Sequence, residues 1–162
     1  MDGDRDGFAE LFHGQFTMMT RLAAALGADD PEDVAQEAFV RLHRSAARLR
    51  DPHAAIGYLR ATVVNLTRSR VRHLGVVSRN PVRAPDPVAS AEQVAALRED
   101  TRVLVAALGQ LSARHREALV LRYWLDLTEA EMAEAMGVSR GTVKSHVSRG
   151  LDALTALMEG SR

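Results

Sequence analysis

The chain has 162 residues, of which 46% are hydrophobic and 4% aromatic, and its formal net charge is zero. It holds no cysteine, which excludes a disulfide framework, a thiol nucleophile and a thiolate metal site. No apolar run approaches the roughly 18 residues of a membrane span, and the acidic N-terminus has no apolar signal core. Because its commonest residues favour helices over strands, we expect an all-α protein of the cytoplasm with no membrane insertion.

Residues 5–48 are expected to form a hairpin of two helices. The first has apolar residues at helical spacing, among them Phe8, Phe12 and Phe16, and Gly27 ends it. The second begins with acidic residues and Pro31, which are favourable at a helix N-terminus. Its core face is Val34, Ala38, Phe39 and Leu42, and the positions left largely outward are Asp33, Gln36, Glu37 and Arg41.

A third helix is expected over residues 54–73, after a break at which Asp51 can act as a cap. Its inward positions are Ile56, Leu59, Val63 and Leu66. Residues 57–84 contain six arginines and no acid, whereas residues 29–37 contain five acids and no base. Charge sorted in this way suggests a basic surface for DNA and an acidic surface for a different partner. The alternative is that both blocks are ordinary solvated helix faces.

Residues 75–90 contain three of the five prolines and show no helical periodicity. This composition predicts a flexible linker between two small helical domains. The expected division is an N-terminal domain of residues 1–74, a linker of residues 75–92 and a C-terminal domain of residues 93–162. Domains of this size are marginally stable alone, so docking on a larger partner is expected.

The C-terminal domain is expected to contain four helices. Ser112 and Ser139 are placed to cap the second and the fourth, and Thr128 and Glu131 form a capping box at the third. Gly137 ends the third helix. The last two helices, joined by "MGVS", have the proportions of a helix-turn-helix.

The fourth of these helices, over residues 140–157, divides into two faces. Its expected inward stripe is Val143, Val147, Leu151 and Leu154. The opposite face has no acid before Asp152 and carries Lys144, the one lysine of the chain. Small residues there would let the helix lie deep in a groove, while long cations reach phosphates and guanine edges. The pattern predicts a DNA-binding helix-turn-helix, and the alternative is a helical hairpin with a solvated basic face.

The segment "LSARHREALVLRYWLDLTEAEMAEAMGVSRGTVKSHVSRGLDAL" resembles the C-terminal domain of extracytoplasmic-function (group IV) sigma factors, which reads the promoter −35 element. A similar helix-turn-helix occurs in response regulators, but the N-terminal half favours the sigma factors. "DPEDVAQEAFVRLHR" resembles their helix that binds core polymerase, and "DPHAAIGYLRATVVNLTRSRVR" resembles their −10-reading segment. Together these segments cover nearly the whole chain in the family's order.

The resemblance implies a subunit that binds core RNA polymerase and directs promoter-specific initiation. It implies contacts with the β′ clamp helices from Asp33, Gln36, Glu37 and Arg41. The −35 positions that it implies are Arg140, Thr142, Lys144, Ser145, His146, Ser148 and Arg149. The −10 positions, for melted DNA, are Asp51, His53, Tyr58, Arg60, Asn65, Arg68 and Arg70. The expected partners are also the β flap, duplex promoter DNA and a separate anti-sigma factor, and the expected location is the nucleoid.

This sequence departs from the family at two positions of the −10 segment. Many members carry a tryptophan where Tyr58 stands, and the acid often found in "NLxRDR" is Ser69 here. These departures leave the −10 stacking partner and the −10 sequence open.

Three other functions are the alternatives to a sigma factor. An enzyme would need a nucleophile–base pair, a phosphate-binding glycine loop or a metal cluster, and the sequence shows none, so no catalytic residue, cofactor or metal is expected. A dimeric promoter-binding regulator would not need the acid-rich helix at residues 30–44. A sigma-like protein that binds polymerase but cannot open promoters stays possible on sequence grounds.

Overall fold

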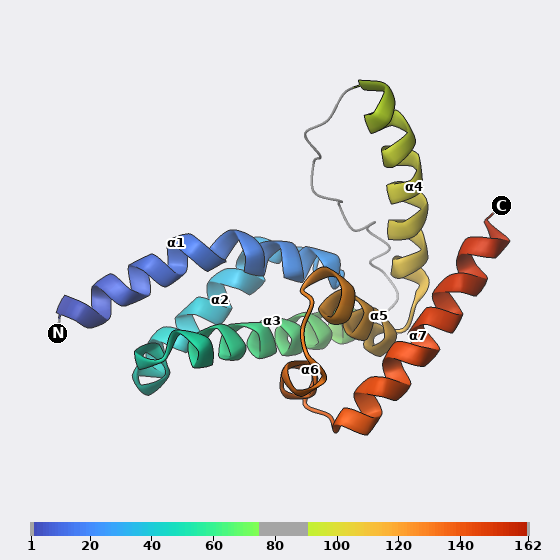
Figure 1. Ribbon diagram of the computed structural model, residues 1–162. Helices are drawn as coiled ribbons and strands as arrows, with labels where there is room; N and C mark the ends of the chain where they lie inside the picture. The colour runs from blue at the N-terminus through green and yellow to red at the C-terminus, as the bar shows by residue number, and fades with distance from the viewer. Residues whose placement is uncertain (1, 75–90, 162) are drawn as a thin grey trace.

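The computed structural model describes residues 2–74 and 91–161, and every regular element in these two ranges is a helix (Figure 1). The N-terminal unit consists of α1 (Asp2–Ala25), α2 (Pro31–Arg44), a short 3-10 helix (Ala46–Arg50) and α3 (Pro52–Leu74). The C-terminal unit consists of α4 (Ala91–Gln110), α5 (Ala113–Leu119), a π-helical turn (Val120–Trp124), α6 (Glu129–Met136) and α7 (Arg140–Gly160). The expected all-α fold with a C-terminal helix-turn-helix is confirmed. The predicted linker lies outside the described residues, apart from its last two, which begin α4.

The N-terminal core forms where aromatic residues of α1 meet α2. The ring centroid of Phe39 lies 5.0 Å from that of Phe12 and 6.1 Å from that of Phe8. The Asp30 carboxylate accepts a hydrogen bond from the backbone N–H of Asp33 at 3.1 Å, which caps α2. The core face predicted for α2 is buried as expected: Val34, Ala38, Phe39 and Leu42.

Helix boundaries differ from the predictions by a few residues. The helix α3 begins at Pro52 rather than near residue 54, because the Asp51 side chain accepts a hydrogen bond from the His53 N–H at 3.0 Å. At the other end of the chain, α7 extends to Gly160 rather than residue 157. Local periodicity locates such helices well but leaves their ends uncertain by about 2–4 residues.

In the C-terminal unit, α5 and α7 cross closely at Gly150, which is buried. A Cβ at this position would lie 3.2 Å from Leu119 Cγ and 3.3 Å from the His115 carbonyl oxygen, so a larger residue would push the helices apart. Of the predicted inward stripe of α7, Val143 is buried and Val147 and Leu154 are half-buried.

Two residues expected to point inward do not enter the core. Leu151 is exposed, because the stripe of α7 continues past the crossing with α5, where α7 has less to pack against. Ile56 is half-buried rather than buried, because it lines an open cleft between α3 and α6. The prediction for Leu151 is therefore wrong, and the prediction for Ile56 is met only in part, as it is for Val147 and Leu154.

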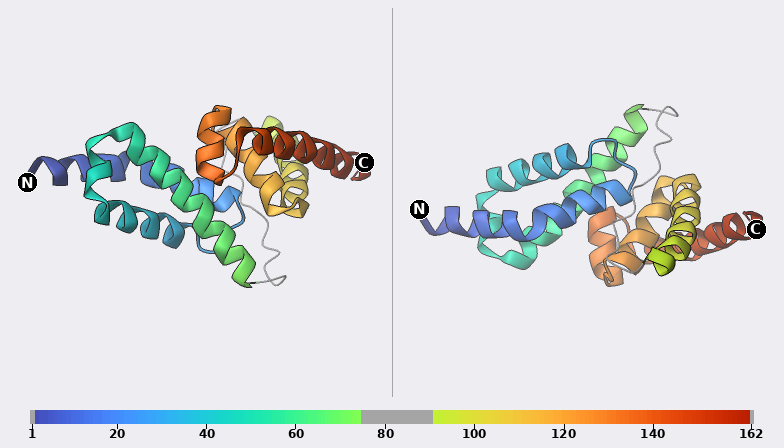
Figure 2. Two further views of the ribbon diagram at one scale, coloured as in Figure 1. Left: turned by 90° about the horizontal axis from the view of Figure 1, so that it is seen from below. Right: turned by 90° about the horizontal axis from the view of Figure 1, so that it is seen from above.

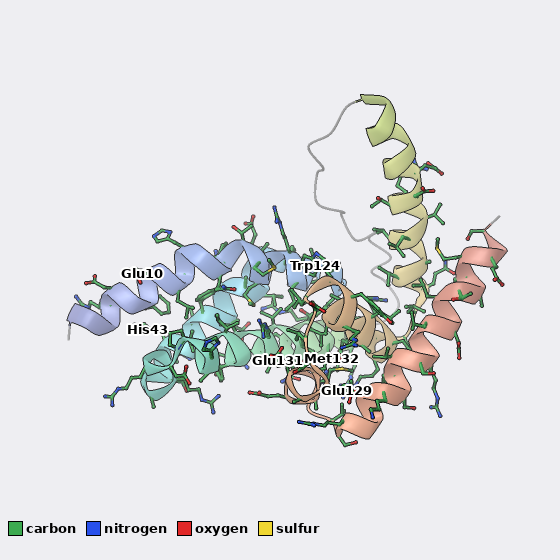
Figure 3. The ribbon with its side chains drawn as sticks, in the orientation of Figure 1. Glu10, His43, Trp124, Glu129, Glu131 and Met132 are labelled. Carbon is green, nitrogen blue, oxygen red and sulfur yellow. The ribbon has the colours of Figure 1, made fainter. Side chains whose placement is uncertain are left out.

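The two units pack against each other, with α6 lying beside α3 (Figures 1 and 2). Buried apolar residues of both units join in one continuous core, to which α6 contributes Met132, Ala135 and Met136. Figure 3 labels Met132 and Glu131 at the place where α6 meets α3. Two units that are each marginal alone thereby share one core. Within the described ranges, no helix is both long enough and apolar enough to cross a membrane.

Candidate nucleic-acid and partner interfaces

The helix-turn-helix of α6 and α7 is built from the caps that the sequence predicts. Thr128 and Glu131 form the reciprocal capping box of α6. Gly137 ends α6 in the left-handed conformation at φ 66°, where a side chain would be strained. Ser139 then caps α7 by accepting a hydrogen bond from the Thr142 N–H at 3.2 Å. These local hydrogen bonds fix the direction in which α7 leaves the turn.

The outer face of α7 presents its polar side chains to solvent. Lys144 has a side chain that is 68% exposed, and its Nζ lies 3.8 Å from a Glu129 oxygen, so this ion pair holds it only weakly. Of the predicted −35 positions, four are exposed and three half-buried. The exposed ones are Arg140, Lys144, Ser148 and Arg149, and the half-buried ones are Thr142, Ser145 and His146.

His146 lies on the flank of α7 that faces α5 rather than on the outermost face. Its ring centroid is 5.8 Å from that of His115, in an edge-on arrangement. Burial lowers the pKa of His146, and the neighbouring His115, Arg114 and Arg149 lower it further, against an opposing effect of Glu117. The imidazole is therefore held towards its neutral form and can both donate and accept a hydrogen bond.

The acidic face of α2 carries the residues predicted to bind polymerase. Asp33, Gln36 and Arg41 are exposed, and Glu37 is half-buried. Glu37 accepts a hydrogen bond from Arg41 at 2.8 Å and one from Arg70 of α3 at 2.7 Å. Burial raises the pKa of Glu37, but the two arginines outweigh it and hold the pKa below its ordinary value. Glu37 is therefore less free than the prediction of an outward side chain implied.

The residues predicted to read the −10 element are spread along α3 and are mostly engaged. Arg70 pairs with α2, while the Arg48 guanidinium lies over the Tyr58 ring at 4.5 Å from its centroid. Asn65 accepts a hydrogen bond from Arg68 at 3.1 Å. The other three, Asp51, His53 and Arg60, line the cleft of about 440 Å³ between α3 and α6.

Two family models match the chain. The model described as "Sigma-70 region 2" matches residues 18–75, and the one described as "Sigma-70, region 4" matches residues 101–154. The RNA polymerase sigma-E factor of Streptomyces avermitilis is 32% identical over 94% of this chain and 85% of its own length. The ECF RNA polymerase sigma factor SigM of Mycobacterium tuberculosis is 30% identical over 96% of this chain and 79% of its own length.

The chain belongs to the extracytoplasmic-function sigma factors. It is thus a promoter-specificity factor, which binds core RNA polymerase and directs initiation through its regions 2 and 4. Sigma factors are regulatory initiation factors and act on polymerase in the cytoplasm.

Two solved structures share the fold of this sigma factor. CnrH, in complex with the cytosolic domain of CnrY, has a TM-score of 0.67 and 22% identity, and the match covers 96% of this chain and 89% of CnrH. RpoE of Bartonella quintana, in complex with the anti-sigma factor NepR, has a TM-score of 0.63 and 23% identity, with 96% and 98% covered. The matches extend over both units of the chain.

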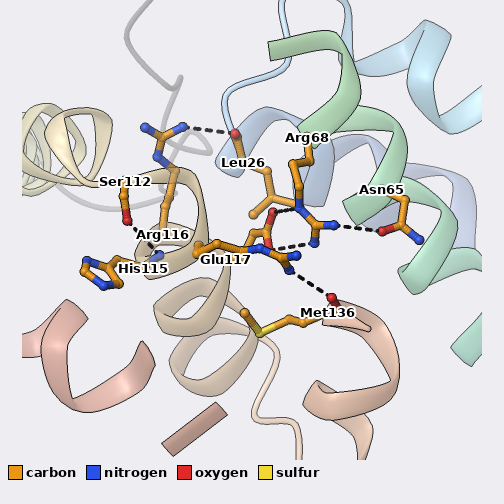
Figure 4. A network of polar contacts seen from close by, with 9 residues as sticks. Leu26, Asn65, Arg68, Ser112, His115, Arg116, Glu117 and Met136 are labelled. Carbon is orange, nitrogen blue, oxygen red and sulfur yellow. Dashed lines mark hydrogen bonds and ion pairs between the residues drawn. The ribbon is translucent and has the colours of Figure 1, made fainter. Parts of the chain in front are cut away.

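The structure adds three residues of α5 that the sequence analysis did not single out (Figure 4). Glu117 accepts two hydrogen bonds from Arg68, at 2.7 and 2.8 Å, so α5 is tied to α3 across the two units. Arg114 lies beside it, with Nη1 at 3.4 Å from a Glu117 oxygen and 2.9 Å from the Met136 carbonyl oxygen. Arg116 donates to the Leu26 carbonyl at 3.1 Å.

One signal for this network was present in the sequence. Glu117 begins "EALVL", whose four apolar residues are all buried, and a charge next to such a run requires a partner if it is buried too. The identity of that partner was beyond local reasoning, because Arg68 is 49 residues away along the chain. Gly27, at φ 94°, allows the Arg116 guanidinium to approach, because a Cβ there would lie 2.8 Å from Arg116 Nη1.

Proposed function

We propose that this sigma factor binds polymerase, duplex DNA and single-stranded DNA through three separate surfaces. The α2 face of Asp33, Gln36, Glu37 and Arg41 docks on the β′ clamp helices, and the outer face of α7 reads the −35 element in duplex DNA. The residues from Asp51, directly before α3, to Arg68 handle the melted −10 strands. We also propose the domain division 1–74, 75–92 and 93–162, and contact of the C-terminal domain with the β flap.

The observation that carries this assignment is the separation of charge between two exposed helical faces. The exposed residues at the start of α7 include Arg140, Lys144 and Arg149 and no acid, as duplex phosphates require. The start of α2 instead presents the exposed acids Asp30, Glu32 and Asp33, which would repel DNA and suit a basic protein surface. A regulator that only binds DNA has no use for the second face.

We further propose that a separate anti-sigma factor controls this protein. The support is that both fold relatives were solved with a bound protein, CnrY for CnrH and the anti-sigma factor NepR for RpoE. We also propose that the chain catalyses no reaction itself and is found with polymerase on the nucleoid. In the described ranges, no group of three or more His, Asp or Glu side chains could hold a metal ion.

Run-off transcription with purified core polymerase tests the assignment. Start sites are first mapped after induced expression, and the promoters found are used as templates with this sigma factor. We expect new start sites that depend on it. DNA binding without redirection of core polymerase would favour a dimeric regulator. Activity on templates with a pre-melted −10 region alone would favour a sigma-like protein that cannot open promoters.

Variants then separate the three surfaces. Gln36→Arg changes an exposed residue of the α2 face and should weaken binding to core polymerase, since it adds a cation to a surface proposed to meet cations. Lys144→Ala on α7 should leave that binding unchanged and weaken binding to promoter DNA. Glu99→Gln, at an exposed position of α4, serves as the control for both measurements.

A further inference from the structure

Arg70 is bound to two residues of the surface proposed to meet polymerase. Its Nη1 lies 2.6 Å from Asp33 Oδ2, and its Nη2 lies 2.7 Å from Glu37 Oε2. Asp33 and Glu37 stand four residues apart on α2, so one planar guanidinium spans one turn of the helix. The second Glu37 oxygen accepts from Arg41 at 2.8 Å, which closes a chain of four charged groups.

We infer that Arg70 is a positioning residue of the polymerase-docking surface and not a contact for −10 DNA. This inference rests on the proposed role of the α2 face. Asp33 and Glu37 each accept a charge-assisted hydrogen bond from Arg70, and their negative charges offset the attraction of the guanidinium for a phosphate. Two carboxylates held in a fixed arrangement lose less conformational entropy when a basic partner binds them.

The matched variants are Arg70→Gln and Arg72→Gln, since Arg72 is an exposed arginine two residues further along α3. Affinity for core polymerase is measured by titration of labelled full-length protein. We expect Arg70→Gln to weaken it about tenfold, Arg72→Gln to leave it unchanged, and Arg70→Lys to restore only part of it, because a point charge replaces a two-pronged donor. Open-complex formation by holoenzyme at saturating sigma factor should be unchanged in Arg70→Gln.

Unchanged polymerase affinity together with impaired opening at saturation would overturn the inference and return Arg70 to the DNA contacts. If Gln36→Arg also fails to weaken polymerase binding, the docking surface itself is misassigned, and the two failures are thereby distinguished. If Arg70→Gln does not fold, Arg70→Lys takes its place: impaired opening at saturation with unchanged polymerase affinity would overturn the inference, and weakened affinity with normal opening supports it. Where Arg70→Gln does fold, a loss of affinity in Asp33→Asn that the double variant does not deepen supports the positioning role as well.

Discussion

The helices α7 and α3 both carry basic residues proposed to contact DNA, but their side chains are in opposite states. On α7, Lys144 and Arg149 are exposed, and the first is held only by a long contact to Glu129. On α3, Arg68 binds the buried Glu117 carboxylate through two short hydrogen bonds. Arg70, which we assign to the polymerase-docking surface, binds the carboxylates of Asp33 and Glu37. The −35 surface is therefore ready in the free protein, whereas the −10 surface is engaged with acids of the same chain.

This difference explains how a chain with zero net charge can bind DNA selectively. Two arginines of α3, Arg68 and Arg70, are neutralised through specific ion pairs with acids of α5 and α2. On the outer face of α7, the ion pair of Lys144 with Glu129 is long, at 3.8 Å, and both groups are exposed. The positive charge of this face can therefore attract DNA from a distance. The cations of α7 can therefore act on duplex DNA, whereas Arg68 and Arg70 of α3 are already paired within the protein.

The largest effect is expected from removing Arg116, which connects α5 to the ends of α1 and α4. Its guanidinium donates to the carbonyls of Leu108, Gly109 and Leu111 at the end of α4, and to Leu26 at the end of α1. Arg116→Ala leaves these acceptors without their charged donor and should lower the free energy of unfolding by about 2–4 kcal/mol. Urea unfolding measures this loss.

Arg102→Ala is the control for that experiment, because Arg102 forms only an exposed ion pair with Glu99 at 3.6 Å. Its effect should stay within about 0.5 kcal/mol. An equally small effect of Arg116→Ala would show that water replaces the guanidinium at all four carbonyls.

The next effect concerns base reading by α7. Arg149→Ala should weaken discrimination at one −35 position by about 1–3 kcal/mol if the guanidinium reads a guanine. Competition binding on promoter variants with single base changes measures it. Equal losses on all sequences would instead make Arg149 a phosphate contact. Lys144→Ala provides the comparison, since a phosphate contact should reduce the salt dependence of binding by about one ion.

For α7 and α3, the exposure and the contacts of the side chains could be predicted from the sequence to different degrees. The caps at Ser112, Thr128 and Ser139 and the left-handed Gly137 involve residues within a few positions of each other, and all were predicted correctly. The exposed face of α7 followed from its periodicity. For α3, periodicity located the helix and most of its core residues but gave no sign that Arg68 and Arg70 are bound.

The reason is that the partners of those arginines are far away along the chain. Glu117 lies 49 residues from Arg68, and Glu37 lies 33 residues from Arg70. The sequence does not distinguish an arginine that pairs with a carboxylate of another helix from an arginine that is free to bind a phosphate. The packing of α6 on α3 could not be predicted either, because both faces of the contact read simply as apolar stripes.

A smaller effect is expected at the start of α6, the helix that contacts both α3 and α7. Thr128→Ala removes the side chain that accepts from the Glu131 N–H at 3.2 Å, and should cost about 1 kcal/mol of stability. Thr128→Ser keeps the hydroxyl and should cost much less. If the alanine variant is as stable as the wild type, water satisfies the first turn of α6 and the capping box contributes only to the geometry of the turn.

The smallest effect is a difference in pH dependence between the two helices. The pKa of His146, on α7, lies below its ordinary value of about 6.5, so the unfolded chain binds a proton more readily than the folded one. Its contribution to stability is complete above that value and is lost as the pH falls below it. The pKa of Glu37, in the network that includes Arg70, is also lowered, but from about 4.5, so its contribution is lost only in more acidic solution. Urea unfolding from pH 8 to about pH 2 should therefore show an upper transition that His146→Gln removes and a lower one, below about pH 4.5, that Glu37→Gln removes. Loss of the upper transition in Glu37→Gln would mean that the two sites titrate together, and that α3 and α7 are less independent than their contacts indicate.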